Sequence, residues 1–165
     1  MEDYQLIQIA FPQEPIWENV ATETLVRLVE HYSDEQSCAT CALSELAVRG
    51  YPDTGWHCRR ILTESKADVW LRCTALALLT KVDSAWSFDY IAREAMTCPA
   101  LLFSEMLSAL WSGLWEKDEA PAKLAISAVQ RRLHNGGLSA ADFLLESQWD
   151  RYCLERDAFE RRFGK

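Results

Sequence analysis

The chain has 165 residues, of which 49% are hydrophobic, and its formal net charge is -8 at pH 7. This length suits one domain with its own core, and a second domain would have too little apolar material. The acidic balance argues against a nucleic-acid binder, because phosphate binding needs clustered lysine and arginine side chains. A basic protein is the better partner.

The N-terminal third of the chain predicts two helices. Residues 1–10 contain a short apolar alternation that fits either an extended strap or a brief helix. Across residues 17–32 apolar side chains recur every three or four positions, which predicts an amphipathic helix with one stripe facing the core. Residues 33–36 offer a cap and a capping-box partner for the next helix, and Gly50 suits the left-handed conformation at its end.

The remaining sequence predicts further helices separated by turns. Residues 52–55 are predicted to form a turn. The expected helices lie near 55–65, 67–81, 84–97 and 99–115, followed by one that opens at Pro121 and closes at 135–137. Residues 139–163, by their pattern, are expected to form one long helix or two short ones. No β-rich segment bounded by turns appears in the middle of the chain, so we expect an all-α fold of eight or nine helices.

One dipeptide recurs at a fixed interval. Ala-Leu stands at residues 42–43, 75–76 and 109–110, in steps of 33 and 34 residues, each time within an apolar helical pattern. Such a period predicts stacked pairs of antiparallel helices, a short α-solenoid. The small residue has a physical reason, because helices of neighbouring repeats approach to about 8–10 Å. The alternative is an irregular helical bundle in which the dipeptides coincide by chance.

The segment 68–79 carries a family resemblance. It reads Asp-Val-Trp-Leu-Arg-Cys-Thr-Ala-Leu-Ala-Leu-Leu, and this acidic start, apolar-Arg pair and Ala-Leu spacing resembles the second helix of a HEAT repeat. The copies at 42–43 and 109–110 lack the arginine, so the resemblance is degenerate and covers about residues 34–134. It implies a single HEAT-like domain over 1–165, with an N-terminal helix and C-terminal capping helices.

The cysteines and histidines favour structural roles. Six cysteines occur, at Cys38, Cys41, Cys58, Cys73, Cys98 and Cys153. Five lie in helical patterns beside Ala or Leu, and no signal peptide is evident, so we expect free thiols in a cytoplasmic protein. Cys38-x-x-Cys41 with His57-Cys58 has zinc-ligand types at an unsuitable spacing, and we expect no metal. His31, His57 and His134 fall near predicted helix ends, where capping is the default interpretation.

Motifs for catalysis and cofactor binding are missing. The sequence has no glycine-rich phosphate loop, no Gly-x-Ser-x-Gly elbow and no His-Glu-x-x-His motif. No apolar run approaches the roughly 18 residues that cross a bilayer. The basic pairs at 59–60, 131–132 and 161–162 each have acids nearby and are interpreted as solvated helix faces. We therefore expect no catalytic residues, no cofactor and no membrane or nucleic-acid partner.

Seven tryptophans are many for this length. Three of them, Trp17, Trp86 and Trp149, lie in or beside apolar stripes and are expected in the core. Trp111 and Trp115 project from the flank of their stripe and are followed by acids, which is typical of an interface anchor. The candidate partner-binding residues are Trp111, Trp115, Glu116, Asp118 and Glu119. The alternative is that a neighbouring helix covers both rings.

Size, charge and fold type together resemble small acidic bacterial immunity proteins of the contact-dependent inhibition type. The resemblance implies that the chain binds a cognate basic toxin domain, often a nuclease, and blocks its active site, as a monomer or weak homo-oligomer. Two alternatives stay open. One is a structural adaptor in a larger complex, and the other is an enzyme on a HEAT-like scaffold, such as a DNA glycosylase or a chromophore lyase.

Overall fold

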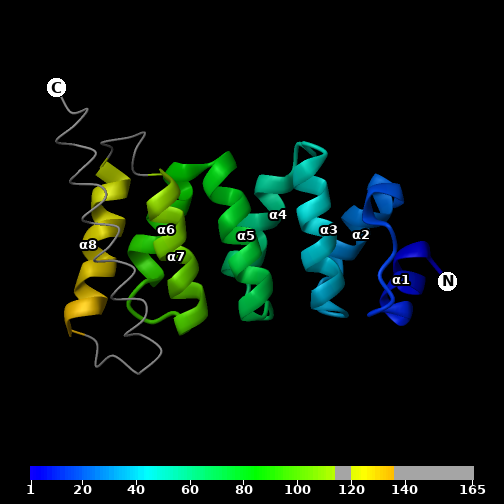
Figure 1. Cartoon of the computed structure of the whole chain (residues 1–165), viewed down its shortest axis with the longest axis horizontal. Helices are drawn as coiled ribbons and strands as arrows, with labels where there is room; N and C mark the ends of the chain where they lie inside the picture. The colour runs from blue at the N-terminus through cyan, green and yellow to red at the C-terminus, as the bar shows by residue number, and fades with distance from the viewer. Residues whose placement is uncertain (114–119, 136–165) are drawn as a thin grey trace. The chain divides into compact units, whose positions relative to one another are not determined.

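The computed structural model describes residues 1–113 and 120–135 (Figure 1). Within this part the chain forms eight α-helices and one 3₁₀ turn, and it contains no strand. The predicted all-α fold is therefore confirmed. Contacts divide the chain into two compact units, of which the first is Met1–Asp83 and the second begins at Ser84. The prediction of a single domain over 1–165 stays a prediction.

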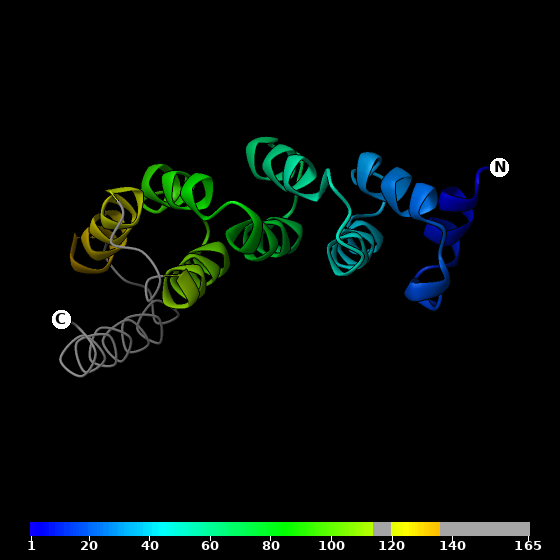
Figure 2. The same cartoon turned by 90° about the horizontal axis from the view of Figure 1, so that it is seen from above.

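The first unit consists of helices stacked in pairs. Its elements are α1 (Asp3–Ala10), η1 (Trp17–Asn19), α2 (Thr22–Glu30), α3 (Gln36–Val48), α4 (Thr54–Thr63) and α5 (Val69–Val82). Helix α2 packs on α3, α4 packs on α5, and α3 and α5 pack on each other. Figure 2 shows α2 and α4 on one side of this unit and α3 and α5 on the other. Two helix pairs thus form two layers.

Side-chain contacts give the direction of these helices. Arg49, at the end of α3, donates to Thr22 Oγ1 at the start of α2 over 3.0 Å. Arg59 of α4 pairs with Asp83, just after α5, at 2.7 Å. Both pairs are therefore antiparallel. Because the N–H of Asp68 donates to Gln36 Oε1, the first turns of α3 and α5 lie side by side. This arrangement of packed pairs is that of a short helical solenoid.

The second unit contains α6 (Ser84–Glu94), α7 (Ala100–Gly113) and α8 (Ala120–Asn135). Helix α8 packs along α6, and α7 contacts both. Arg132 of α8 donates from Nη1 to the carbonyls of Ala95, at 2.8 Å, and Cys98, at 2.7 Å, just beyond the end of α6. Its Cζ also lies 4.2 Å from the ring centroid of Phe103. Arg132 fixes three segments together, so its predicted place on a solvated face is wrong.

The recurring dipeptide lies in the core of both units. Residues 42–43 belong to α3, 75–76 to α5 and 109–110 to α7, and all six side chains are buried. In the first unit, Ala42 and Ala75 lie on the two helices that pack on each other. A small side chain at such positions permits close approach of helices. The sequence period therefore marks equivalent buried positions on α3, α5 and α7.

The N-terminal segment differs from its prediction. Residues 1–10, left open between strap and helix, include α1, which is held by an ion pair from Glu2 to Arg27 at 2.9 Å. The helix predicted over 17–32 is divided into η1 and α2 by extended backbone at Val20 and Ala21. Arg49 donates to carbonyls at η1 and stabilises this break.

Three helix boundaries also differ. The cap within residues 33–36 is Glu35, whose Oε1 accepts the N–H of Ser37 at 3.1 Å. Helix α4 begins at Thr54, inside the predicted turn 52–55. Helix α6 ends at Glu94 and not at Thr97. Each difference is of a few residues, which is typical where local hydrogen bonds decide the end of a helix.

The end of α3 is a turn that requires glycine. Gly50 has a φ of 66°, as predicted, and its N–H donates to the carbonyl of Ala47. The N–H of Tyr51 donates to the carbonyl of Leu46. This pair of hydrogen bonds is a Schellman motif, in which the left-handed residue is usually glycine. The motif turns the chain so that Tyr51 and the start of α4 follow directly.

We expect Gly50→Ala to lower the free energy of unfolding by about 1–2 kcal/mol, the cost of a left-handed conformation for a residue with a Cβ. No atom lies within 4 Å of that added Cβ, so the cost comes from the backbone alone. Gly55→Ala is the matched control, because its Cβ would meet Val82 Cγ1 at an ordinary 3.6 Å. In a helix this change adds up to about 1 kcal/mol of stability. Urea unfolding followed by circular dichroism measures both, and a stabilising Gly50→Ala would contradict the assignment.

Candidate functional site

The predicted partner-binding residues are not settled by the structure. Trp111 belongs to α7, but its side chain is outside the described part of the molecule. Trp115, Glu116, Asp118 and Glu119 all lie outside the described residues. The partner-binding role of these five residues therefore stays a prediction.

Two other tryptophans are exposed to solvent, which the sequence did not predict. Trp56, near the start of α4, exposes 52% of its surface, and Trp70, in the first turn of α5, exposes 66%. Trp17 and Trp86 are half-buried, so their predicted place in the core is wrong. Trp149 lies outside the described residues. The exposed ring of Trp56 adjoins a recess.

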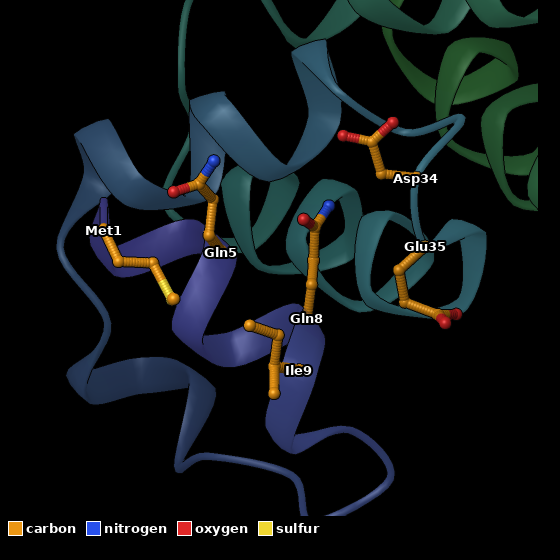
Figure 3. A pocket seen from close by; sticks show the side chains of 6 residues that line it. All are labelled: Met1, Gln5, Gln8, Ile9, Asp34 and Glu35. Atoms are coloured by element: carbon orange, nitrogen blue, oxygen red, sulfur yellow. The ribbon is translucent and has the colours of Figure 1, made fainter.

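One recess lies beside α1 (Figure 3). It has a volume of about 390 Å³, with Met1, Gln5, Gln8 and Ile9 on one side and Asp34 and Glu35 on the other. Gln8 Nε2 is buried and has no hydrogen-bond partner among the described residues. Glu35 is already engaged as the cap of α3, and none of the six side chains is itself fully buried. This recess therefore has no fully buried side chain to position a ligand, and one of its two carboxylates already caps a helix.

A second recess lies between α2 and α4, and its lining is chemically richer. It measures about 350 Å³ and is lined by Val26 and Glu30 of α2 together with Tyr51, Asp53, Trp56 and His57. Two carboxylates, two aromatic rings and one imidazole therefore share one small concave surface. We call these six residues the α2–α4 recess.

The loop between α3 and α4 builds one wall of the α2–α4 recess. After the Gly50 turn, the carbonyl of Tyr51 accepts hydrogen bonds from the N–H of Thr54, at 3.2 Å, and from its Oγ1, at 2.7 Å. The N–H of His57 donates to the carbonyl of Asp53 at 3.0 Å, which closes the first turn of α4. Local hydrogen bonds thus place Tyr51, Asp53 and His57 on one short stretch of backbone.

His57 is the buried centre of the recess. It is 3% exposed, and its Nδ1 has no hydrogen-bond partner among the described residues. Its ring contacts Trp56 edge to face, at 4.9 Å between centroids, and lies 6.3 Å from the ring of Tyr51. The interpretation of His57 as a helix cap is therefore wrong, whereas His134, in the last turn of α8, contacts the carbonyl of Gln130 as predicted.

The electrostatic surroundings keep His57 neutral near pH 7. Burial is the main cause that lowers the pKa of His57 below its ordinary value, and the charge of Arg60 acts in the same direction. The carboxylates of Glu30 and Asp53 oppose this shift. A neutral imidazole has one nitrogen that accepts a hydrogen bond, and Nδ1 is the nitrogen left without a partner among the described residues.

Arg60 of α4 contacts α2 and the ring of Trp56. It donates from Nη2 to the carbonyl of Val29 at 2.8 Å, near the end of α2. Its Nε lies 3.9 Å from Glu64 Oε1, and its Cζ lies 5.2 Å from the ring centroid of Trp56. These contacts fix α4 against α2. Because Arg60 is engaged in this way, its predicted place on a solvated face is wrong.

The two carboxylates of the recess are available to a ligand. Glu30 and Asp53 are exposed, and no salt bridge between described residues includes either of them. Asp53 stands at the cap position of α4, but its side chain makes no capping hydrogen bond. Glu30 and Asp53 therefore bring two negative charges to the recess, beside the single positive charge of Arg60.

The chemistry that this arrangement favours is recognition of a cation. Burial raises the pKa of Cys58 to about 12, so the thiol next to His57 is protonated near pH 7 and is no nucleophile. The same cause raises the pKa of Cys38 to about 12. Among the described residues, no three histidine, cysteine, aspartate or glutamate side chains lie close enough to hold a metal ion. Carboxylates beside aromatic rings bind ammonium and guanidinium groups well.

Sequence reasoning missed most of this recess. The Gly50 turn was predicted and leads directly to Tyr51, and the pair Trp56-His57 follows within one turn of helix. That local signal could have indicated one wall. Nothing in the sequence shows that Glu30, from another helix, faces the same space, because the approach of α2 to α4 depends on tertiary contacts.

Comparison with protein-family models, with curated proteins and with solved structures finds no match to this chain. Inferences about function therefore depend on the geometry of the molecule itself. Among the described helices, none combines the length and apolar character needed to cross a bilayer.

Proposed function

We propose that this chain is a binding module for a basic protein, and that it acts as an immunity protein in the bacterial cytoplasm. It binds a cognate toxin domain and blocks the active site of that toxin, with no catalytic step of its own. The net charge of -8 and the acidic, aromatic α2–α4 recess support this proposal. The HEAT-like resemblance of segment 68–79 is part of the same proposal.

The observation that carries the proposal is that six arginines contact carbonyls or acids of the same chain, whereas Glu30 and Asp53 have no ion-pair partner among the described residues. The arginines whose contacts are described largely serve the fold. Arg49, Arg60 and Arg132 donate to main-chain carbonyls at helix ends, while Arg27, Arg59 and Arg93 form ion pairs with acids of the same chain. These six arginines are thus engaged within the chain, and the formal net charge of -8 leaves an excess of carboxylates for a partner.

An acidic surface of this kind favours a cationic partner for two reasons. Opposite charges speed the encounter of two proteins and orient their docking. Carboxylates on a rigid helical scaffold also match a positively charged cleft that normally receives phosphate groups, so they can occupy a nuclease active site. Nucleic acid is a poor ligand for the same surface, because arginines engaged with carbonyls are not free to contact phosphates.

The test is to mix the purified chain with the basic protein encoded by the adjacent gene. We expect an equimolar complex that survives gel filtration at about 0.15 M salt, where weak long-range attraction is screened. We also expect the toxic activity of the partner to fall in proportion to the complex formed. Hen egg lysozyme, a basic protein of unrelated surface, is the control and should elute separately.

Two results would overturn the proposal. Absence of a complex with the neighbouring gene product would contradict the proposal that this product is the cognate partner. A complex that leaves the activity of the partner unchanged would select a structural adaptor over an immunity protein.

A further inference from the structure

We infer that the α2–α4 recess receives the guanidinium group of an arginine side chain presented by the basic partner. The inference rests on the proposed function and adds the contact through which binding occurs. It depends on four observations, namely the size of the recess, the buried imidazole, the charge balance and the exposed aromatic ring.

The size and shape fit one side chain. A volume of about 350 Å³ is at the lower end of the range of about 300–1,000 Å³ that ligand pockets occupy. The walls come from two helices and a short loop that hydrogen bonds hold in place. A recess of this kind is largely formed before binding, which reduces the entropy that a partner must lose.

The imidazole of His57 indicates the chemical nature of the ligand. It is 97% removed from solvent, lines the recess and leaves Nδ1 without a partner among the described residues. Buried polar atoms in native proteins are nearly always hydrogen-bonded, so this atom lacks a donor that a ligand can supply. A neutral imidazole with its proton on Nε2 accepts at Nδ1, and a guanidinium N–H is a strong donor.

The charge of the recess selects a cation. Glu30 and Asp53 are free of ion pairs among the described residues, while Arg60 lies 3.9 Å from Glu64 Oε1. An anionic ligand would meet two carboxylates without compensation. A divalent metal ion is disfavoured because no three suitable ligands converge in the described part of the chain.

The aromatic residues favour arginine over lysine. Trp56 exposes 52% of its surface, and the ring of Tyr51 lies 6.3 Å from that of His57. A planar guanidinium can stack on such rings and at the same time present several N–H groups to carboxylates. Arg60 of the same chain lies 5.2 Å from the Trp56 centroid, so a guanidinium of the partner would contact the exposed part of this ring. The compact ammonium of lysine gains less from a planar stack.

The experiment uses N-acetyl-arginine amide as the probe and the isolated full chain as the receptor. Titration is followed by ¹H–¹⁵N NMR of the Trp56 indole and the His57 ring, assigned through Trp56→Phe and His57→Phe. We expect saturable shifts of these two signals with a dissociation constant on the order of 1 mM. N-acetyl-citrulline amide, which has the same shape without the charge, should bind at least about 10-fold more weakly. The lysine analogue should also bind more weakly than arginine.

Variants then test the residues. The double change Glu30→Gln and Asp53→Asn should weaken probe binding by about 10-fold or more, because it removes two charged acceptors. His57→Phe keeps an aromatic ring at this position but removes the acceptor at Nδ1, and it should also weaken binding by about 10-fold. The matched control is Glu18→Gln with Glu23→Gln, an equal change of charge at exposed sites in the same unit. This control should bind the probe as the parent chain does, and thermal melting verifies that all variants fold.

The outcomes separate this inference from the proposed function. Equal binding of arginine and citrulline analogues, or shifts confined to signals outside the recess, would overturn the inference. If the neighbouring gene product binds the parent and the Glu30→Gln, Asp53→Asn variant equally well, the inference fails and the proposed function stands. If the arginine probe binds in the recess but the neighbouring protein forms no complex, the arginine site stands and the proposed function fails.

Discussion

Replacement of Leu43 by alanine is expected to lower the free energy of unfolding by about 2–5 kcal/mol, the usual range for a buried leucine. Leu43 is fully buried on α3, a helix that packs on both α2 and α5. A central helix with neighbours on two sides has little freedom to collapse into the space left by the lost atoms. The cost should therefore lie in the upper half of that range. Urea unfolding followed by circular dichroism measures it.

The control for Leu43→Ala is Val48→Ala in the same helix. Val48 is 81% exposed, and removing its methyl groups should change the free energy of unfolding by less than about 0.5 kcal/mol. Both changes leave alanine, the residue with the highest helix propensity, in α3. A similar small effect at both positions would contradict the assignment of residues 42–43 to the core.

The success of the Ala-Leu period has a simple physical cause. A repeat that packs mainly on its neighbours places the same demands on each copy. The position that faces the next helix needs a small residue, and the adjacent position needs a large one to fill the core. These demands are local and periodic, so they were visible at 42–43, 75–76 and 109–110 without knowledge of the fold. The helices α3, α5 and α7 were identified for the same reason.

The roles of the arginines were not visible in the sequence for the opposite reason. Arg60 and Arg132 stand in basic pairs on amphipathic helices, which is the usual pattern of a solvated face. Their acceptors are carbonyls 31 and 34 to 37 residues away. Those carbonyls belong to helix ends whose position depends on the stacking of the pairs. No property of residues 59–60 or 131–132 reports on that stacking.

The α2–α4 recess shows the same division between local and tertiary information. The turn at Gly50 and the first turn of α4 follow from local hydrogen bonds. These bonds fix the backbone that carries Tyr51 and His57. The contribution of Glu30 follows from the contact of Arg60 with the end of α2. Arg60 of α4 thus contacts the end of α2, the other helix that lines the recess.

Arg132→Ala is expected to lower the free energy of unfolding by about 3 kcal/mol, because Arg132 makes two charged hydrogen bonds to carbonyls, each contributing about 1.5–3 kcal/mol.

Those carbonyls, of Ala95 and Cys98, follow the end of α6, and the guanidinium also lies 4.2 Å from the ring centroid of Phe103. Arg131→Ala is the matched control, since this neighbour on α8 is exposed and its loss should cost less than about 0.5 kcal/mol. Arg132→Lys keeps the charge and loses the planar contact with Phe103, so an intermediate loss is expected. Chemical unfolding of the three variants measures these changes in the free energy of unfolding. Equal stability of Arg131→Ala and Arg132→Ala would contradict the prediction. It would mean that the contact of Arg132 with the end of α6 adds nothing to the free energy of unfolding.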